Sequence, residues 1–254
     1  VGRLLEAEGY RVAIVPQPNW RDDLRDFTKL GVPRLFFGVS GGAMDSMVNH
    51  YTANLRLRHD DAYTPGGKAG FRPDHAVTVY SQILKRLYPH VQVVVGGIEA
   101  SLRRLTHYDY WSDALKPSVL ANSGADLLIY GMGERVVQEV ARAMRNGYNA
   151  FLSDESYVSR LDPATTIRLN SYEECVRDKA AFGENFTVIE TQSNLMNPEA
   201  TLVEAVGGRC VVVTPANATF STEELDHSFD LPYERAPHPR YAGKGDIPAW
   251  EMIK

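Results

Sequence analysis

The chain has 254 residues, of which 44% are hydrophobic and 23% charged, and its net charge at pH 7 is −5. This composition is typical of a soluble globular protein with one α/β domain or one domain and a smaller appendage, and without a basic block it does not indicate nucleic-acid binding. The apolar runs are all shorter than the roughly 20 residues that cross a bilayer, and no signal peptide is recognised, so we expect no membrane association. The two cysteines, Cys175 and Cys210, are too far apart for a metal-binding pair and too few for a disulfide framework, which favours a reduced, cytoplasmic setting.

Both ends of the sequence suggest a segment of a longer protein. The first residues, VGRLLEAEGY, have the apolar periodicity of a helix that begins without a cap, with Gly9 as its C-cap. The last residues, IPAWEMIK, are apolar and follow a proline-rich stretch.

From residue 11 to about residue 144, short apolar runs alternate with helical periodicity. The expected strands span residues 11–16, 34–39, 91–95 and 125–131. The expected helices span residues 21–31, 75–88 and the segment that follows MGERV. Continuous apolar strands that alternate with helices predict a doubly wound, mostly parallel α/β sheet.

Three of these strands end in glycine-containing turns, whose glycines are Gly41, Gly42, Gly96, Gly97, Gly131 and Gly133. The carboxyl ends of parallel strands share one edge of the sheet, where ligands bind, so we expect the three loops to converge. The polar residues on these loops are Asp45, Glu99, Arg103, Arg104 and Glu134. Glycine also serves tight strand-to-helix turns that bind nothing, and both interpretations stay open.

Residues 49–73 show no sustained period but are rich in aromatic residues, and we expect an ordered loop over the sheet edge. This loop carries His59, Asp60 and Asp61, and the segment GGIEASLRRLTHYDYWSD carries His107 and Asp109. Histidine and carboxylates are suitable ligands for iron, manganese or zinc. The spacing matches neither a zincin nor a calcium loop, and aspartates equally cap short turns, so no metal ligand is predicted.

The same segment contains the aromatic residues Tyr108, Tyr110 and Trp111. They could stack on a flat ligand or a partner domain, or pack beneath the loop 49–73. Arg103 and Arg104 could clamp a carboxylate or phosphate, or pair with the nearby aspartates. The sequence contains no evident Ser-His-Asp, Cys-His, P-loop or GxGxxG arrangement.

After about residue 147 the pattern changes to a smaller α+β extension. Capping boxes predict helices at 171–182 and 221–229, Asn197 with Pro198 predicts a helix over 197–206, and 208–215 is an expected strand. Residues 232–248 contain four prolines and read as an extended connector. We expect three parts, 1–147, 148–231 and 232–254.

Several long motifs of the chain resemble the N-terminal region of the YgiQ-type radical SAM proteins. They are LFFGVSGGAMDSMVNHYTA, LRHDDAYTPGG, VVVGGIEASLRRLTHYDYWSD, STEELDHSFDLPYERAPHPRY and IPAWEMIK. The resemblance implies that the intact protein carries a 4Fe–4S cluster whose open iron binds S-adenosylmethionine, and that cleavage gives a 5′-deoxyadenosyl radical. The family's CxxxCxxC motif follows the position where IPAWEMIK ends, so this segment ligates no cluster and is expected to be inactive alone.

The pieces VVVGGIEAS and LLIYGMGERVVQEV also resemble the later strands of a cobalamin-binding-type domain, a flavodoxin-like fold. In that fold the first strand and the loop with a cobalamin-ligating histidine would precede Val1, so the resemblance does not support cobalamin binding. Without that strand, residues 11–16 would lack their inner partner, and we expect the segment to be rearranged or less stable.

The functional hypothesis is an accessory domain of a radical SAM enzyme whose edge loops cover or shape the substrate cavity. Its partners would be the downstream radical SAM core and an unknown substrate. One alternative is a ligand-binding module, such as a degenerate cobalamin-type domain. Another is a structural domain whose loops only pack on the core.

Overall fold

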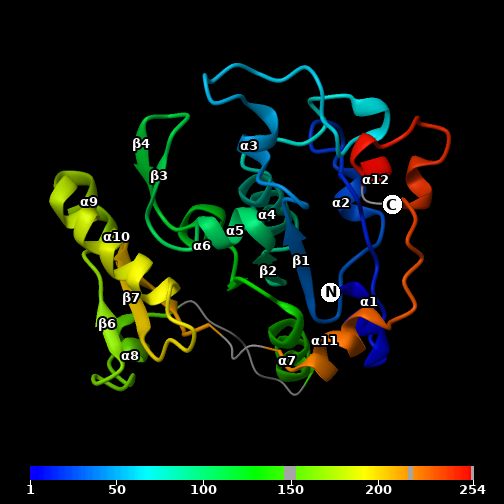
Figure 1. The fold of residues 1–254 in the computed structure, drawn as a ribbon. Helices are drawn as coiled ribbons and strands as arrows, with labels where there is room; N and C mark the ends of the chain where they lie inside the picture. The colour runs from blue at the N-terminus through cyan, green and yellow to red at the C-terminus, as the bar shows by residue number, and fades with distance from the viewer. Residues whose placement is uncertain (146–152, 217–219, 253–254) are drawn as a thin grey trace.

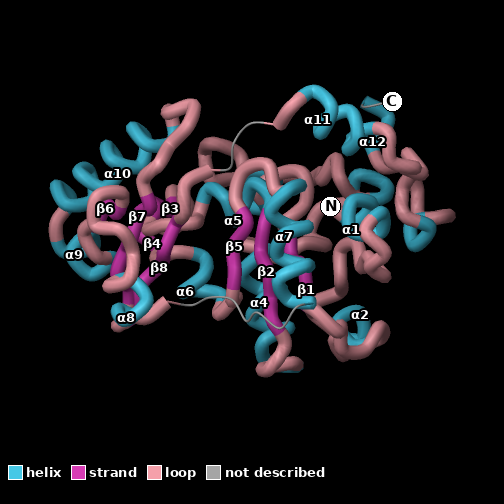
Figure 2. Tube along the Cα trace, turned by 90° about the horizontal axis from the view of Figure 1, so that it is seen from below, coloured by secondary structure: helices cyan, strands magenta, loops and turns pink. Residues whose placement is uncertain are grey.

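The computed structural model describes residues 1–145, 153–216 and 220–252. At its centre lies a parallel sheet of β1 (Phe36–Ser40), β2 (Gln92–Gly96) and β5 (Leu127–Ile129), in the order β1-β2-β5. Figure 2 shows these strands side by side. Phe36 pairs with Gln92 and Val94 with Leu127, so the three carboxyl ends lie on one edge. The prediction of an α/β fold with a parallel sheet is confirmed.

Helices cover both faces of this sheet. Val93 and Val95 belong to the same hydrophobic cluster as α4 (Ala76–Leu87) and α6 (Val119–Ser123). Val94, between them, packs with α1 (Gly2–Ala7) and α7 (Glu134–Arg145). Successive strand residues point to opposite faces, which is why a strand buried on both sides has an uninterrupted run of valines.

Short elements occupy the carboxyl edge of the sheet (Figure 1). They are α3 (Ser46–His50), the 3-10 turn η1 (Pro65–Gly67), α5 (Gly97–Leu102) and the antiparallel hairpin of β3 (His107–Asp109) and β4 (Ala114–Lys116). The short helix α2 (Arg25–Thr28) packs instead along α4, with the Phe27 ring 5.8 Å from the Tyr80 ring. The loop 49–73 is ordered, as expected, and contains η1.

A second sheet contains β6 (Thr166–Arg168), β7 (Thr201–Val206) and β8 (Arg209–Val213). The helices of this part are α8 (Glu155–Val158), α9 (Tyr172–Arg177) and α10 (Lys179–Ser193). Leu202 of β7 and Val211 of β8 belong to the same hydrophobic cluster as β2 and α4, so the second sheet packs against the first part. The expected boundary between the two parts, at 147, lies outside the described residues.

The remaining elements are α11 (Thr222–Phe229), the 3-10 turn η2 (Pro239–Tyr241) and α12 (Pro248–Met252). Capping boxes open α9 at Ser171 and α11 at Ser221, as predicted. The α1 helix is also confirmed, with Glu8 as its C-cap and Gly9 following at φ +83°.

Two expected elements were wrong, and a third is shorter than expected. Residues 11–16 form no strand: Val12 packs with α1 and α7, and the Pro16 carbonyl accepts a hydrogen bond from Arg240. The helix expected over 21–31 is reduced to α2, because Asp22 and Asp23 accept the backbone N–H groups of the residues that would form its first turn.

The helix expected over 197–206 is instead the strand β7, which pairs with β6 and β8. Pairing on both sides and burial of its branched residues override the capping signal of Asn197 and Pro198. The helix expected over 171–182 ends at Arg177, and the side chain of Asp178 caps a new helix, α10.

Candidate functional site

The three glycine loops meet at the carboxyl edge of the sheet. A Cβ atom on Gly97, after β2, would lie 2.7 Å from the Ser40 Oγ at the end of β1. The N–H of Gly131, after β5, donates to the Ser101 Oγ at 3.2 Å. The expected convergence is confirmed, and Gly42, Gly96 and Gly133 lie in the same loops.

Glu99, with 1% of its surface exposed, holds this edge together from inside. Its two carboxylate oxygens accept the N–H of Ser46 at 3.0 Å and the N–H of Val77 at 2.8 Å, in the first turns of α3 and α4. Gly41 lies against this carboxylate, since a Cβ there would be 2.6 Å from its Oε2. Glu99 and Gly41 therefore anchor helices and do not face a ligand.

Asp45 and Arg103 form a buried ion pair between the first and second loops. Asp45 also caps α3 by accepting the N–H of Met47 at 2.9 Å and of Val48 at 3.2 Å. Burial raises the pKa of Asp45, but the hydrogen bond and charge of Arg103 and these backbone donors outweigh burial and hold it below its ordinary value.

Arg104 donates to the Ser101 carbonyl at 2.9 Å and to the Ser193 Oγ at 3.0 Å, and its guanidinium stacks on Tyr130. The expectation that Arg103 and Arg104 could pair with the aspartates of the hairpin was wrong, because both guanidinium groups have nearer partners. The Nε atoms of both arginines are buried without a hydrogen-bond partner in the described residues, and the anion-clamp alternative stays a prediction.

Of the three residues His59, Asp60 and Asp61 in the loop 49–73, only Asp61 is buried. Asp61 is 1% exposed and receives both Arg72 contacts, at 3.1 and 3.4 Å, while Arg72 also donates to the Gly41 carbonyl at 2.9 Å. His59 and Asp60 are exposed. Asp61 therefore fastens the loop to the sheet edge.

The hairpin β3–β4 packs on the loop 49–73. The Tyr110 hydroxyl donates to the Ala53 carbonyl at 2.8 Å, and the rings of Trp111 and Tyr51 are 6.4 Å apart. Tyr108 donates to Asp113 at 2.6 Å. These contacts match the packing alternative for the aromatic residues.

Sequence reasoning missed four residues of this site, which are His50, Tyr51, Asp74 and His75. His50 Nδ1 lies 2.8 Å from Asp74 Oδ1, and the Tyr51 hydroxyl donates to Asp74 Oδ2 at 2.7 Å. His75 Nε2 lies 3.9 Å from Asp109 Oδ1. The dipeptide Asp74-His75, where the long loop enters a helix, could have indicated this site, since polar residues are frequent at helix N-termini.

These contacts link His50, Tyr51, Asp74 and Trp111 in one group and His75 with Asp109 in another, and the chain itself joins the two groups at Asp74-His75 and over residues 109–111. We call these six residues the histidine–carboxylate ring. Within it, His50 Nε2, Asp109 Oδ1 and Trp111 Nε1 are buried and have no hydrogen-bond partner in the described part of the chain. Buried polar atoms are nearly always paired, so this ring has unused hydrogen-bonding capacity.

His107 lies beside this ring and is neutral at pH 7. Burial lowers its pKa to about 4, while the Leu105 carbonyl opposes this shift and the nearby Arg103 adds to it. Glu134 opens α7, and no hydrogen bond links it to the other candidate residues over 1–145, 153–216 and 220–252.

The residues of this chain do not fit an iron–sulfur cluster, which takes several cysteine thiolates. Cys175 and Cys210 are both buried, in α9 and β8. Cys175 accepts a hydrogen bond from Asn185 at 3.2 Å, and burial raises its pKa to about 11. In the described residues no group of three or more His, Cys, Asp or Glu is placed to hold a metal ion.

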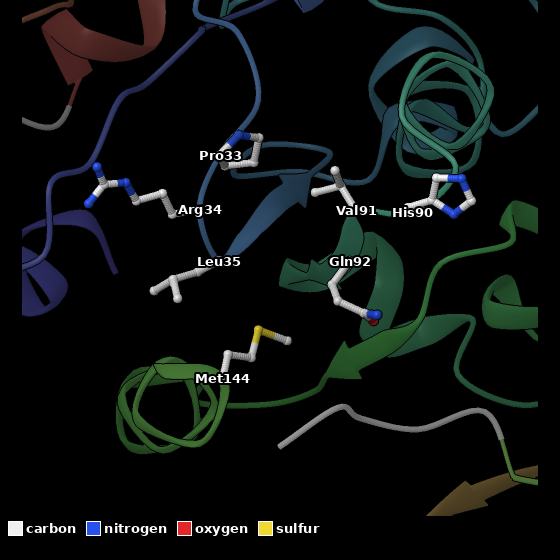
Figure 3. Close-up of a pocket in the computed structure, with 7 residues that line it drawn as sticks. All are labelled: Pro33, Arg34, Leu35, His90, Val91, Gln92 and Met144. Carbon is white, nitrogen blue, oxygen red and sulfur yellow. The ribbon is translucent and has the colours of Figure 1, made fainter. Parts of the chain in front are cut away.

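A hollow of about 280 Å³ lies at the opposite edge of the sheet (Figure 3). Its walls are Pro33, Arg34, Leu35, His90, Val91, Gln92 and Met144. None of the candidate residues lines it. Among the helices of the described ranges, none is both long and apolar enough to cross a membrane.

Comparison with known proteins assigns the chain to a family. All of residues 1–254 match the family described as Radical SAM N-terminal. The chain is 54% identical to a UPF0313 protein of Bacteroides thetaiotaomicron and 57% identical to one of Porphyromonas gingivalis, covering all of this chain and 44% and 41% of theirs. It is 46% identical to a UPF0313 protein of Rhodopseudomonas palustris, again over 41% of that protein. The chain thus spans less than half the length of these relatives, and no solved structure matches it. The chain belongs to the radical SAM N-terminal family and is similar over its full length to part of the UPF0313 proteins.

Proposed function

We propose that this chain is the accessory region of a radical SAM enzyme and that its carboxyl sheet edge faces the catalytic core and helps to enclose the substrate. The observation that carries this proposal is the course of the last described residues. The Ala249 N–H donates to the Ala62 carbonyl at 2.8 Å, and the Gly66 N–H donates to the Asp246 carbonyl at 2.7 Å. Figure 1 shows α12 beside the loop that carries η1. The connector thus returns to the loop that covers this edge.

The surface of the same region supports the proposal. Leu57 is 63% exposed, Leu55 is 47% exposed, and Tyr108 of the hairpin is 51% exposed. Exposed apolar side chains gathered on one region are typical of a surface that another domain covers. The unpaired atoms of the histidine–carboxylate ring lie below this surface and would serve a ligand enclosed there.

We infer that the central sheet is of the doubly wound, flavodoxin-like type seen in cobalamin-binding domains. Its parallel order and the helices on both faces support this assignment. In the described residues β1 is an edge strand, and a further strand would pair on its outer side. The separate sheet β6–β8 supports the division at about residue 147. The cluster and S-adenosylmethionine would be bound outside this chain, because its two cysteines do not fit a cluster.

The proposal is tested by photocrosslinking in the full-length protein. Leu57 or Tyr108 is replaced by p-benzoylphenylalanine, and the matched control is the same replacement at Phe186 of α10, an aromatic residue that is 55% exposed. Irradiation of the cluster-reconstituted protein should join Leu57 and Tyr108 to peptides of the part that follows residue 254. Crosslinks to that part from Phe186 alone would show that the core docks elsewhere.

A second experiment tests the two alternatives, a purely structural domain and a cofactor-binding domain. The variant W111A is made in the full-length protein, and cluster absorbance, thermal unfolding and cobalamin binding are measured. For a substrate-side role, we expect an unchanged cluster spectrum and no cobalamin binding by the parent protein. A large loss of thermal stability with an otherwise normal protein would favour a purely structural domain.

A further inference from the structure

His75 occupies an unusual position at the rim of the histidine–carboxylate ring. It directly precedes α4 with φ +51° and ψ 54°, a left-handed conformation that is uncommon for residues other than glycine. Its side chain is 31% exposed, and its Nε2 atom lies 3.9 Å from Asp109 Oδ1. Backbone strain of this kind persists where the surroundings fix a side chain in place.

Asp109 is the opposite in exposure, with only 3% of its surface accessible. Its Oδ2 atom accepts hydrogen bonds from the Ser112 N–H, at 3.1 Å, and from the Ser112 hydroxyl. Its Oδ1 atom is buried and has no hydrogen-bond partner across the described ranges. The free carboxylate oxygen is therefore the one that faces His75.

The other charged or titratable groups nearby are paired with other residues or are neutral. Arg103 is paired with Asp45, and His50 is paired with Asp74. His107 is neutral at pH 7, because burial lowers its pKa to about 4. His75 is thus the titratable group that faces Asp109 Oδ1, and no hydrogen bond occupies its Nδ1 in the described structure.

We propose that His75 is the acid–base residue of the substrate cavity and that Asp109 positions it. This inference rests on the proposed function, because the substrate would be held between this edge and the core. The separation of 3.9 Å is longer than a hydrogen bond, and catalytic hydrogen bonds are often long in ligand-free sites and shorten when substrate binds.

The proton transfer is balanced within the pair and the substrate. The substrate is one with an O–H or N–H group, whose proton moves to His75 Nδ1 while the bonding electron pair stays on the substrate oxygen or nitrogen. The resulting imidazolium keeps its Nε2–H toward Asp109, whose negative charge stabilises it. Return of the proton from Nδ1 to the product restores the neutral imidazole.

The test measures the reactivity of individual histidines in the full-length, cluster-reconstituted protein. Diethyl pyrocarbonate is applied at alkaline pH, where imidazoles are neutral, and modification of each histidine is followed by mass spectrometry. The control is His90, which is exposed at the opposite edge of the sheet. A carboxylate at Nε2 makes Nδ1 more nucleophilic, so His75 should react several-fold faster than His90 although it is less accessible.

The variant D109N should remove this excess reactivity and leave His90 unchanged. Equal rates for His75 and His90 in the parent protein, or an excess that persists in D109N, would overturn the assignment. If D109N does not fold, the comparison within the parent protein still decides. The Leu57 crosslink separates the two proposals. Rapid modification of His75 without that crosslink would support the His75–Asp109 pair and refute the proposed position of the core. The crosslink without rapid modification of His75 would refute only the role of the pair.

Discussion

The substitution Gly41→Ala tests whether the buried Glu99 carboxylate organises the carboxyl edge. A Cβ atom at residue 41 would lie 2.6 Å from Glu99 Oε2 and 3.1 Å from Glu99 Cδ, well inside van der Waals contact. The carboxylate cannot turn away freely, because the N–H groups of Ser46 and Val77 hold its two oxygens. The new methyl group must therefore displace a hydrogen-bonded charge.

The cost follows from these contacts. Displacing Oε2 breaks its bond to the Ser46 N–H, and a hydrogen bond to a charged group contributes about 1.5–3 kcal/mol. Residual overpacking adds about 1 kcal/mol or more. We expect Gly41→Ala to lower the local free energy of unfolding by about 3 kcal/mol, which is a factor of roughly 100 in the opening equilibrium.

The assay is amide hydrogen exchange of the full-length protein, read from peptides of β1 and the first turn of α3. The matched control is Gly38→Ala in the same strand, where a Cβ would be 3.9 Å from the Phe36 ring and makes an ordinary contact. Exchange near Ser46 should accelerate in Gly41→Ala and stay close to the parent rate in Gly38→Ala. Equal exchange in the two variants would refute the reasoning.

Three further predictions concern buried charges. The pKa of Asp45 is lowered in the folded protein, so its carboxylate contributes stability that is complete above its unfolded pKa of about 3.9 and is lost as the pH falls through the folded value. In D45N, the midpoint of urea unfolding should therefore fall less steeply with decreasing pH than in the parent protein. Burial raises the pKa of Glu204 to about 7, so the parent protein loses stability as the pH rises from about 4.5 to 7. The free energy of unfolding of E204Q should therefore be higher than that of the parent at pH 8 but not at pH 4. Arg72→Ala leaves Asp61 buried without its cation and should cost about 3–5 kcal/mol in thermal unfolding, whereas Arg56→Ala, in the exposed part of the same loop, should stay within about 0.5 kcal/mol.

The sheet could be predicted from the sequence because its signals are local. The run Val93–Val95 is long enough and apolar enough to identify a strand buried on both faces, and Gly41 and Gly97 mark the turns that follow two strands. The strand β7 could not be predicted in the same way. Asn197 and Pro198 carry a genuine helix-start signal, and only pairing with β6 and β8, which are distant in sequence, decides against it.

The candidate site was predictable in its location but not in its pairing. Parallel strands bring Asp45 and Arg103 together at one edge, yet the sequence interval between them gives no sign of an ion pair, and nearer aspartates were the obvious partners. His75 was hidden for a related reason. It lies in a helical pattern, and its importance appears only when Asp109, more than thirty residues later, is placed beside it.

The pattern of burial at this edge separates anchoring carboxylates from available ones. Glu99, Asp45 and Asp61 are buried, and donors or cations contact their oxygens. These carboxylates therefore hold helices and loops in place. Asp109 is buried to a similar degree but keeps one oxygen without a partner in the described structure. An unpaired buried carboxylate oxygen is costly, and it is tolerated where a proton, a cation or a ligand completes it. The partly exposed imidazole of His75 lies 3.9 Å from this oxygen, which is why we propose this pair as the position where the edge acts on a bound molecule.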